Sequence, residues 1–299
     1  MSAAATAHRP MGAAAAATMV LLCAIWALGQ ISIKVGVQGI SPLWQAGLRS
    51  LGAAVLVGAW TMAHGIRLRP ERGRAGWSLA IGVAFALEFV LLYRGIELTT
   101  AARGSLLLFT APFFVAIGGH RLLADPLTPT RLAGLALAFV GVGLALSEGG
   151  SGGDLGHGDW RGDLMCLGAD VAWAATTLMI KGTSLRTEPA ERALFAQLAV
   201  SAPLLLAASV ARGEPGVFAP GPLVWAAFAW QVLAVASVSY LCWFGLIRRH
   251  SPASLSAFSF LTPLFGVAFA ALLLREPLTP TLVAAAALIA GGILLVNRR

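Results

Sequence analysis

Long apolar runs alternate with short polar stretches along the whole chain. The runs are continuous and about 20 residues long, which is the length of a helix that crosses a bilayer. A membrane barrel would instead alternate polar and apolar residues within shorter segments. The pattern therefore predicts an all-α integral membrane protein. We expect ten transmembrane helices, near residues 11–37, 42–63, 75–97, 102–123, 129–147, 161–183, 189–211, 222–247, 253–274 and 280–297.

The composition agrees with a membrane location. Of the 299 residues, 58% are hydrophobic and only 11% are charged, with a mean hydropathy of +0.81, whereas a soluble domain carries about 25% charged residues. The net charge of +8 does not indicate nucleic-acid binding, because the Arg residues form short clusters between apolar runs. The first run is too long for a signal peptide. We expect a multi-pass protein of the bacterial inner (cell) membrane, embedded in the lipid bilayer.

Positive residues are shared unevenly between the two sets of loops. With the N-terminus placed in the cytoplasm, 14 of the 21 Lys and Arg residues lie at cytoplasmic helix ends and 6 at the opposite ends. Cytoplasmic loops carry the excess of Lys and Arg in membrane proteins. We therefore predict both termini in the cytoplasm (N-in, C-in) and the acidic linker 148–159 in the periplasm.

The chain also contains an internal repeat. A shift of 147 residues places Trp26 and Lys34 on Trp173 and Lys181. A shift of 151 residues places the sequence Pro-Leu-Thr-Pro-Thr on a second copy of itself. We divide the chain into a first five-helix repeat, a periplasmic linker and a second five-helix repeat, at residues 11–147, 148–159 and 160–297.

Five is an odd number, so the second repeat starts on the opposite side of the membrane from the first. Equivalent helices of the two repeats then run in opposite directions. Inverted repeats of this kind build many secondary transporters and hold the substrate site at their interface near the middle of the membrane. The repeat therefore favours a transporter that works by alternating access.

Further features occur once in each half. They are the turns at 124–128 and 275–279, the prolines Pro112 and Pro263, and the glycines Gly141 and Gly292. With these features the chain resembles the drug/metabolite transporter superfamily, in its ten-helix EamA-type branch. Asp125 departs from the Glu that is usual in this turn. The resemblance covers nearly the whole chain and implies export of amino acids or other small metabolites, and one similar group exports aromatic amino acids.

Two stripes related by the repeat are candidates for lining a substrate cavity. Trp26 and Gln30 are four residues apart, as are Trp173 and Thr177, so each pair shares one helix face. Polar groups are costly against lipid and usually point inward. Tryptophans near helix ends fit the interfacial belt, but Trp26, Trp173 and Trp230 lie in the middle of their runs. We expect these three rings to line the cavity.

Charged residues within the apolar runs have two interpretations each. Glu88 is either a proton carrier or a partner for a substrate ammonium group, or else a buried structural hydrogen-bonding group. Asp170 has the same alternatives. Arg49 either pairs with one of these acids or anchors its helix on the cytoplasmic side. For Lys34 and Lys181 we expect helix-end side chains that extend to the membrane surface.

The eighth run adds Tyr240, whose ring and hydroxyl group suit a substrate contact, although packing between helices is the alternative role. A cavity with several aromatic rings and few charges suits a small zwitterion with an apolar or aromatic side chain. The sequence holds no Gly-rich phosphate loop, no metal-spaced His or Cys residues and no Gly-x-Ser-x-Gly motif. We therefore predict no cofactor, no metal and no enzyme activity.

Together these patterns predict a secondary transporter that exports small metabolites, with amino acids as the foremost class and protons as the candidate coupling ion. The alternatives are a cation or drug exporter of the same fold, an integral-membrane enzyme and a structural or signalling membrane protein. The predicted coupling residues are Glu88 and Asp170. The predicted substrate-binding residues are Trp26, Gln30, Glu88, Trp173, Thr177 and Tyr240.

Overall fold

The computed structural model describes residues 12–108, 110–123, 127–147, 159–247, 258 and 261–297. Regular structure within these residues is helical, apart from one isolated bridge between Ile40 and Val217. The first half contains α1 (Ala13–Gly36), α2 (Pro42–Ala63), α3 (Ala75–Leu98), α4 (Ala101–Leu108), α5 (Ala111–Leu122) and α6 (Pro129–Ser147). The second half contains α7 (Trp160–Gly182), η1 (Ser184–Thr187), α8 (Ala190–Ala211), α9 (Pro222–Trp230), η2 (Gln231–Val238), α10 (Ser239–Ile247), α12 (Leu261–Leu274) and α13 (Pro280–Asn297).

Seven of the described segments are long and apolar enough to cross a membrane. They are α1, α2, α3, α4 with α5, α7, α8, and α9 with η2 and the start of α10. Three shorter apolar helices are α6, α12 and α13. The start of the predicted helix 253–274, most of the linker 148–159 and the turn residue Asp125 lie outside the described residues.

The predicted continuous helix 102–123 is wrong in one respect, because α4 ends at Leu108 and α5 begins at Ala111. Pro112 has no N–H group and cannot donate to the carbonyl group four residues earlier, which is that of Leu108. The hydroxyl group of Thr110 instead donates to the carboxylate of Asp170 on α7, at 2.7 Å. The fourth apolar run is therefore a broken helix that α7 supports.

The predicted helix 222–247 also differs from a uniform α-helix. Its central part, η2, is a π-helix that joins α9 to α10. Such segments are rare and often occur at functional sites. The side chains of η2 and α10 therefore point in directions that differ from those expected for a continuous α-helix.

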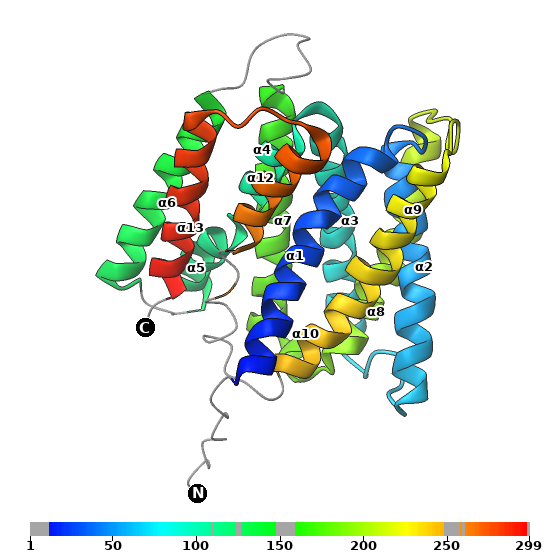
Figure 1. The fold of residues 1–299 in the computed structure, drawn as a ribbon. Coiled ribbons are helices and arrows are strands. Elements are labelled where there is room, and N and C mark those ends of the chain that lie inside the picture. Colours follow the sequence, from blue (N-terminus) through cyan, green and yellow to red (C-terminus); the bar gives the residue numbers. More distant parts are fainter. Residues whose placement is uncertain are drawn as a thin grey trace, which may run out of the picture.

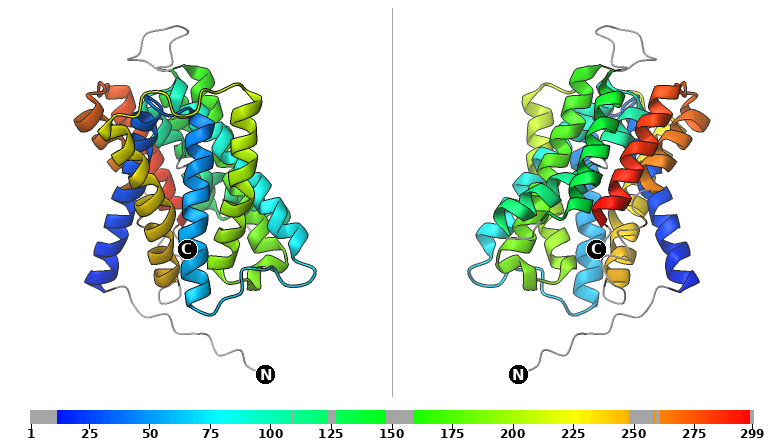
Figure 2. Two further views of the ribbon diagram at one scale, coloured as in Figure 1. Left: turned by 90° about the vertical axis from the view of Figure 1, so that its right-hand side faces the viewer. Right: turned by 90° about the vertical axis from the view of Figure 1, so that its left-hand side faces the viewer.

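Elements of the two halves pack on each other in a reciprocal pattern. α2 packs on α8 and α6 on α13, and in each pair the two elements are equivalent by the repeat. The contact of α1 with α12 corresponds to that of α7 with α4 and α5. Likewise, the contact of α3 with α8 corresponds to that of η2 with α2. Figures 1 and 2 show α6 and α13 side by side.

The two ends of the molecule are distinguished by the helix termini that they hold. α3 ends and α7 begins at the upper end in Figure 1, where the N–H group of Asp159 donates to the carbonyl of Leu98 at 3.0 Å. α1 also ends there, and α6 begins at the opposite end. α1 and α7 therefore run in opposite directions. We name the two ends after the lysines that they hold, the Lys34 end (upper) and the Lys181 end (lower).

Candidate functional site

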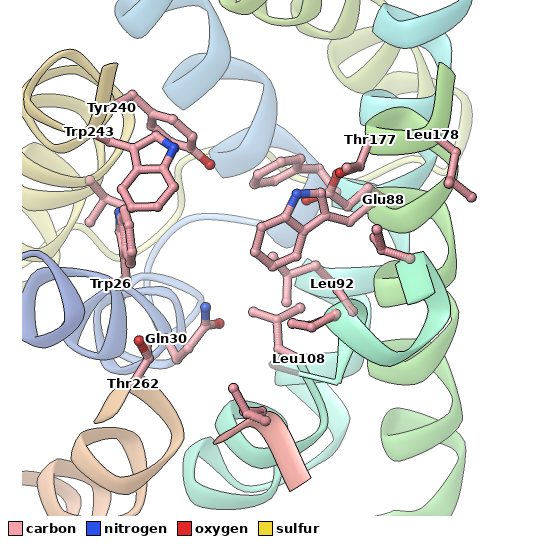
Figure 3. Close-up of a pocket in the computed structure, with 18 of the residues that line it drawn as sticks. Trp26, Gln30, Glu88, Leu92, Leu108, Thr177, Leu178, Tyr240, Trp243 and Thr262 are labelled. Atoms are coloured by element: carbon pink, nitrogen blue, oxygen red, sulfur yellow. The ribbon is translucent and has the colours of Figure 1, made fainter. Parts of the chain in front are cut away.

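A cavity of about 430 Å³ lies between helices of the two halves (Figure 3). All six predicted substrate-binding residues line it, with Trp26, Gln30 and Tyr240 across the cavity from Glu88 and Thr177. The other lining residues are Gly29, Ile33, Arg49, Phe89, Leu92, Leu108, Ala111, Pro112, Val115, Ala116, Gly119, Leu123, Arg131, Leu178, Lys181, Gln231, Val235, Trp243, Thr262, Ile293 and Val296. Trp230 is not among them.

The α1 wall of the cavity is held by contacts with α10. The indole N–H of Trp26 donates to the hydroxyl oxygen of Ser239 at 2.8 Å. Its ring meets Trp243 edge to face, with the two centroids 5.7 Å apart and an interplanar angle of 74°. Gln30, one turn along α1, is 7% exposed, and its side-chain oxygen has no hydrogen-bond partner in the described structure. The Trp26 ring is thus fixed, while Gln30 offers an unused acceptor.

The α7 wall is less constrained. Trp173 is 37% exposed, and no hydrogen bond or ring contact of its indole occurs among the described residues. Thr177 lies one turn further along α7 and also lines the cavity. The repeat-related Trp26 and Trp173 therefore differ, because one ring is packed and the other is available for a ligand.

Two ionisable side chains, one acidic and one basic, line the cavity. Glu88 is 7% exposed, and its Oε2 has no hydrogen-bond partner in the described structure. Arg49 is 3% exposed, and its Nη1 likewise has no partner there. The guanidinium carbon of Arg49 lies 4.3 Å from the centroid of the Phe89 ring, a cation–π contact. No Arg49–Glu88 ion pair within 4 Å forms between these described side chains.

Asp170, the second predicted coupling residue, does not line the cavity. It is completely buried, and one carboxylate oxygen accepts the hydrogen bond from Thr110 at the break between α4 and α5. Carboxylates at a helix N-terminus stabilise its unpaired N–H groups. Its position fits a structural role at the start of α5, and its role in coupling stays a prediction.

Gln231 of η2 forms part of the cavity wall that the sequence did not single out as a binding site. Its side-chain oxygen accepts from the hydroxyl of Tyr93 at 2.6 Å, and its Nε2 donates to the carbonyl of Ser32 at 2.9 Å. The side chain thereby ties η2 to α1 and α3. A buried Gln in an apolar run was the available signal, but only the structure gives its partners.

Beyond the cavity, the Lys34 end is closed by polar contacts. The expectation that the Lys34 ammonium reaches the membrane surface is wrong. It donates to the carbonyl oxygens of Ile96 at 2.9 Å and Glu97 at 3.2 Å, and also to that of Thr99. These carbonyls lie at or just beyond the C-terminus of α3, where a cation compensates the unpaired acceptors of the helix. Lys34 thus joins α1 to α3.

A buried ion pair lies at the same end. Arg103 of α4 is 3% exposed and pairs with Asp163 of α7, which is completely buried and also accepts from the hydroxyl of Thr99 at 2.6 Å. Glu276 accepts from the N–H groups of Ala101 at 2.8 Å and Ala102 at 2.9 Å. The carboxylate of the Arg-Glu-Pro-Leu-Thr turn therefore caps a helix of the other half.

The cavity opens at the Lys181 end. Its lining residues toward the Lys34 end, Ile33 and Leu108 among them, are buried. Toward the other end the lining includes Lys181, which is exposed, and Leu123 and Arg131, which are half-exposed. In this conformation a ligand would enter between the C-terminus of α7 and the N-terminus of α6.

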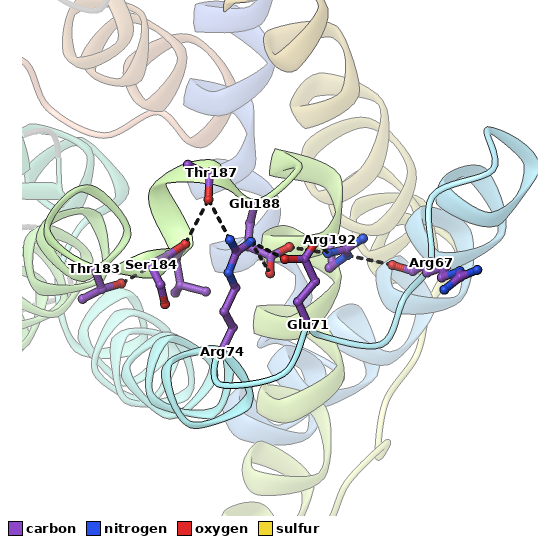
Figure 4. Close-up of polar contacts among 9 residues, drawn as sticks. Arg67, Glu71, Arg74, Thr183, Ser184, Thr187, Glu188 and Arg192 are labelled. Atoms are coloured by element: carbon purple, nitrogen blue, oxygen red, sulfur yellow. Dashed lines mark hydrogen bonds and ion pairs between the residues drawn. The ribbon is translucent and has the colours of Figure 1, made fainter.

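A cluster of charges joins the halves at the Lys181 end (Figure 4). The Glu188 carboxylate, 2% exposed, accepts from Arg74 at 3.2 Å and from Arg192 at 2.6 Å. Arg192 also donates to the backbone carbonyl of Arg67 at 2.7 Å. The loop between α2 and α3 is thus bound to the start of α8, and the residues of this cluster do not line the cavity.

Comparison with known proteins assigns this architecture. The model of the EamA-like transporter family matches residues 13–147 and again residues 160–298. The chain belongs to the EamA-like transporter family. Together with the apolar helices, this makes it a multi-pass membrane protein. The family description is that of a transporter and not of an enzyme.

Relatives of this EamA-family chain extend over most of its length. An uncharacterized transporter of Synechocystis sp. is 26% identical, covering 92% of this chain and 87% of its own. Probable amino-acid metabolite efflux pumps of Salmonella typhimurium and Escherichia coli are each 29% identical and cover 91% of both chains. A solved crystal structure matches with a TM-score of 0.65 at 20% identity over 93% of both chains, which establishes the fold.

Proposed function

We propose that this protein is a secondary transporter that exports small metabolites across the bacterial inner membrane by alternating access, with amino acids, aromatic ones included, as its substrates. The observation that carries the proposal is the cavity between the halves, closed at one end and open at the other. Its walls are aromatic, and it is lined by Glu88 and Arg49, each with one polar atom that has no hydrogen-bond partner in the described structure. The names of two relatives, probable amino-acid metabolite efflux pumps, point the same way.

The proposal includes ten membrane crossings in two inverted repeats, residues 11–147 and 160–297, with 148–159 as the periplasmic linker. The α6–α13 contact supports this symmetry. A Cβ atom on Gly134 would lie 2.8 Å from the carbonyl oxygen of Gly292, and one on Gly141 would lie 3.0 Å from that of Ala285. A shift of 151 maps Gly134 to Ala285 and Gly141 to Gly292. Each close contact is therefore the two-fold mate of the other, as in an isologous interface.

The orientation in the membrane follows from the charges. Arg74 and Arg192 lie with Lys181 at the end where the cavity opens, whereas Lys34 and Arg103 lie at the closed end. With the positive excess in the cytoplasm, both termini are cytoplasmic, and the cavity faces the cytoplasm. This is the state in which an exporter accepts its substrate.

Glu88 is the coupling residue of this proposal, since it is the one carboxyl group among the described residues that line the cavity. A proton on Glu88 and a substrate ammonium group would compete for the same oxygen atoms, which links export to proton entry. The same unpaired carboxyl group is the observation that favours the alternative, a cation or drug exporter of this fold.

The test is transport by the purified protein in liposomes, across a panel of amino acids and organic cations, with and without a pH gradient. We expect transport of amino acids across the liposome membrane, stimulated by a pH gradient, and loss of that stimulation in Glu88→Gln. Glu97→Gln is the matched control, because it makes the same change on the same helix outside the cavity. Cation transport without amino-acid transport would establish the alternative. Gradient-stimulated transport by Glu88→Gln would rule out this coupling site.

A further inference from the structure

Arg49 is a buried cation without a carboxylate partner. It lies in α2, within a membrane-spanning segment, and it lines the cavity while being only 3% exposed. A guanidinium group carries five N–H donors, and Nη1 of Arg49 donates to no described atom. Burying a charge in a membrane span is costly, and such residues mark substrate pathways. The position therefore requires a reason beyond the stability of α2.

Arg103 shows how the same fold accommodates a buried arginine that has a structural role. It is equally buried, and Asp163 neutralises it across a helix contact. Arg49 instead places its guanidinium group over the Phe89 ring, and this contact uses none of its N–H donors in the ring plane. No described carboxylate forms an ion pair with it within 4 Å, so a ligand anion would complete its hydrogen bonds.

The acid that lines the same cavity, Glu88, is also incompletely paired, because its Oε2 has no described hydrogen-bond partner. One cation and one carboxylate, both buried and not ion-paired with each other, match a ligand that brings the opposite charge to each. A bidentate carboxylate fits the Arg fork, and an ammonium group fits Glu88. The exposed ring of Trp173 lies on the wall where a side chain would go.

We propose that Arg49 is a specificity residue that binds the substrate's carboxylate, while Glu88 binds its ammonium group. The protein then selects zwitterions and discriminates against amines, amides and esters that lack the free carboxylate. This inference rests on the proposed transport of amino acids, and it specifies which protein group binds each charged group of the substrate.

The test pairs ligand changes with protein changes. Binding of phenylalanine, phenethylamine (no carboxylate) and 3-phenylpropionate (no ammonium) is measured by calorimetry for the full chain in nanodiscs. Truncating one partner of a buried charge pair costs a factor of about 30 or more. In Arg49→Gln we expect that loss of affinity for phenylalanine and phenylpropionate, with little change for phenethylamine. In Glu88→Gln we expect it for phenylalanine and phenethylamine, with little change for phenylpropionate. Arg49→Lys should restore part of the affinity, and Arg94→Gln, outside the cavity, should leave all three unchanged.

The outcomes separate the two proposals. If wild type binds phenylalanine but Arg49→Gln weakens phenylalanine and phenethylamine equally, the role of Arg49 is overturned and amino-acid binding stands. If wild type binds phenethylamine better than phenylalanine, both are overturned in favour of a cation exporter. Should Arg49→Gln fail to fold, as judged by size-exclusion chromatography, the wild-type preference for phenylalanine over phenethylamine and over phenylalanine methyl ester decides the question.

Discussion

Two lysines that the repeat makes equivalent lie in opposite surroundings. Lys34 donates to three carbonyl groups at the end of α3 and closes its end of the molecule. Lys181 is exposed at the cavity mouth, and the described structure contains no hydrogen bond from its ammonium group. The two repeat-related lysines thus have different environments in the same conformation of the protein.

This difference is what an alternating-access cycle requires. If the halves exchange conformations, Lys34 loses its carbonyl partners when its end opens, and Lys181 gains the equivalent ones near the end of α10. The contacts at the Lys34 end would then form in one state only. The α2–α8 and α6–α13 contacts join equivalent elements and would be kept in both states. The predictions that follow test this comparison, from the largest expected effect to the smallest.

The first prediction concerns the side of the membrane that each end faces. In a background without native cysteines, Gln38→Cys at the Lys34 end should react with an impermeant maleimide only from the periplasm. Arg69→Cys, in the loop between α2 and α3, should react only from the cytoplasm. The reverse labelling pattern would invert the orientation, and the cavity would then face outward.

The second prediction concerns the ion pair at the closed end. Asp163→Ala leaves Arg103 buried without a partner, which should cost about 3–5 kcal/mol of stability, measured by thermal unfolding in detergent. The control is Glu97→Gln in the Arg94–Glu97 pair, whose side chains are 24% and 35% exposed and which should contribute at most about 1 kcal/mol. Equal effects would show that the buried pair does not hold this end together.

The third prediction uses a native thiol as a reporter. Cys166 is completely buried on α7, three residues after Asp163. Lys34→Met removes charge-assisted hydrogen bonds worth about 1.5 kcal/mol or more in total, so opening of this end should increase about tenfold. The alkylation rate of Cys166, with Cys23 and Cys242 replaced by Ala, measures it.

The matched control for that experiment is Lys181→Met, the same change at the equivalent position. It removes no described hydrogen bond, so Cys166 should react as slowly as in wild type, or more slowly. A faster reaction in both variants would mean that the lysines do not distinguish the two ends.

The fourth prediction concerns the paired tryptophans. Trp173→Ala should weaken binding of aromatic substrates roughly 2- to 10-fold more than binding of aliphatic ones, because an aromatic contact contributes about 0.5–1.5 kcal/mol. Trp26→Ala should weaken both classes alike, since Trp26 is held by Ser239 and Trp243. Competition binding with phenylalanine and leucine measures the ratio. An equal loss for both ligands in Trp173→Ala would indicate packing.

The sequence predicts the helices well because each apolar run must pair its own backbone groups inside lipid. The prediction of α2 at 42–63 matches Pro42–Ala63. The break after Leu108 could also have been predicted from the sequence, because Pro112 cannot donate the hydrogen bond to the Leu108 carbonyl. The family assignment followed from the repeat and from the two turns.

Contacts between distant residues were not readable in the same way. Lys34 looked like a snorkelling side chain because its carbonyl partners lie 62 to 65 residues further along the chain. Asp170 and Glu88 looked alike in sequence, yet one lies at a helix break and the other lines the cavity. Periodicity gives the face of a helix but not the element that it meets.

The π-helix η2 sets the rotational phase of everything beyond it. Gln231 and Tyr240 are nine residues apart, which is about two and a half turns of an α-helix and would place them on opposite faces. The wider turns of η2 accumulate less rotation, and both side chains line one cavity. Deleting a single residue between Val232 and Val238 would turn α10 by somewhat less than the roughly 100° that one α-helical residue contributes. Tyr240 and Trp243 would then face away from the cavity, although every side chain in it would be chemically unchanged.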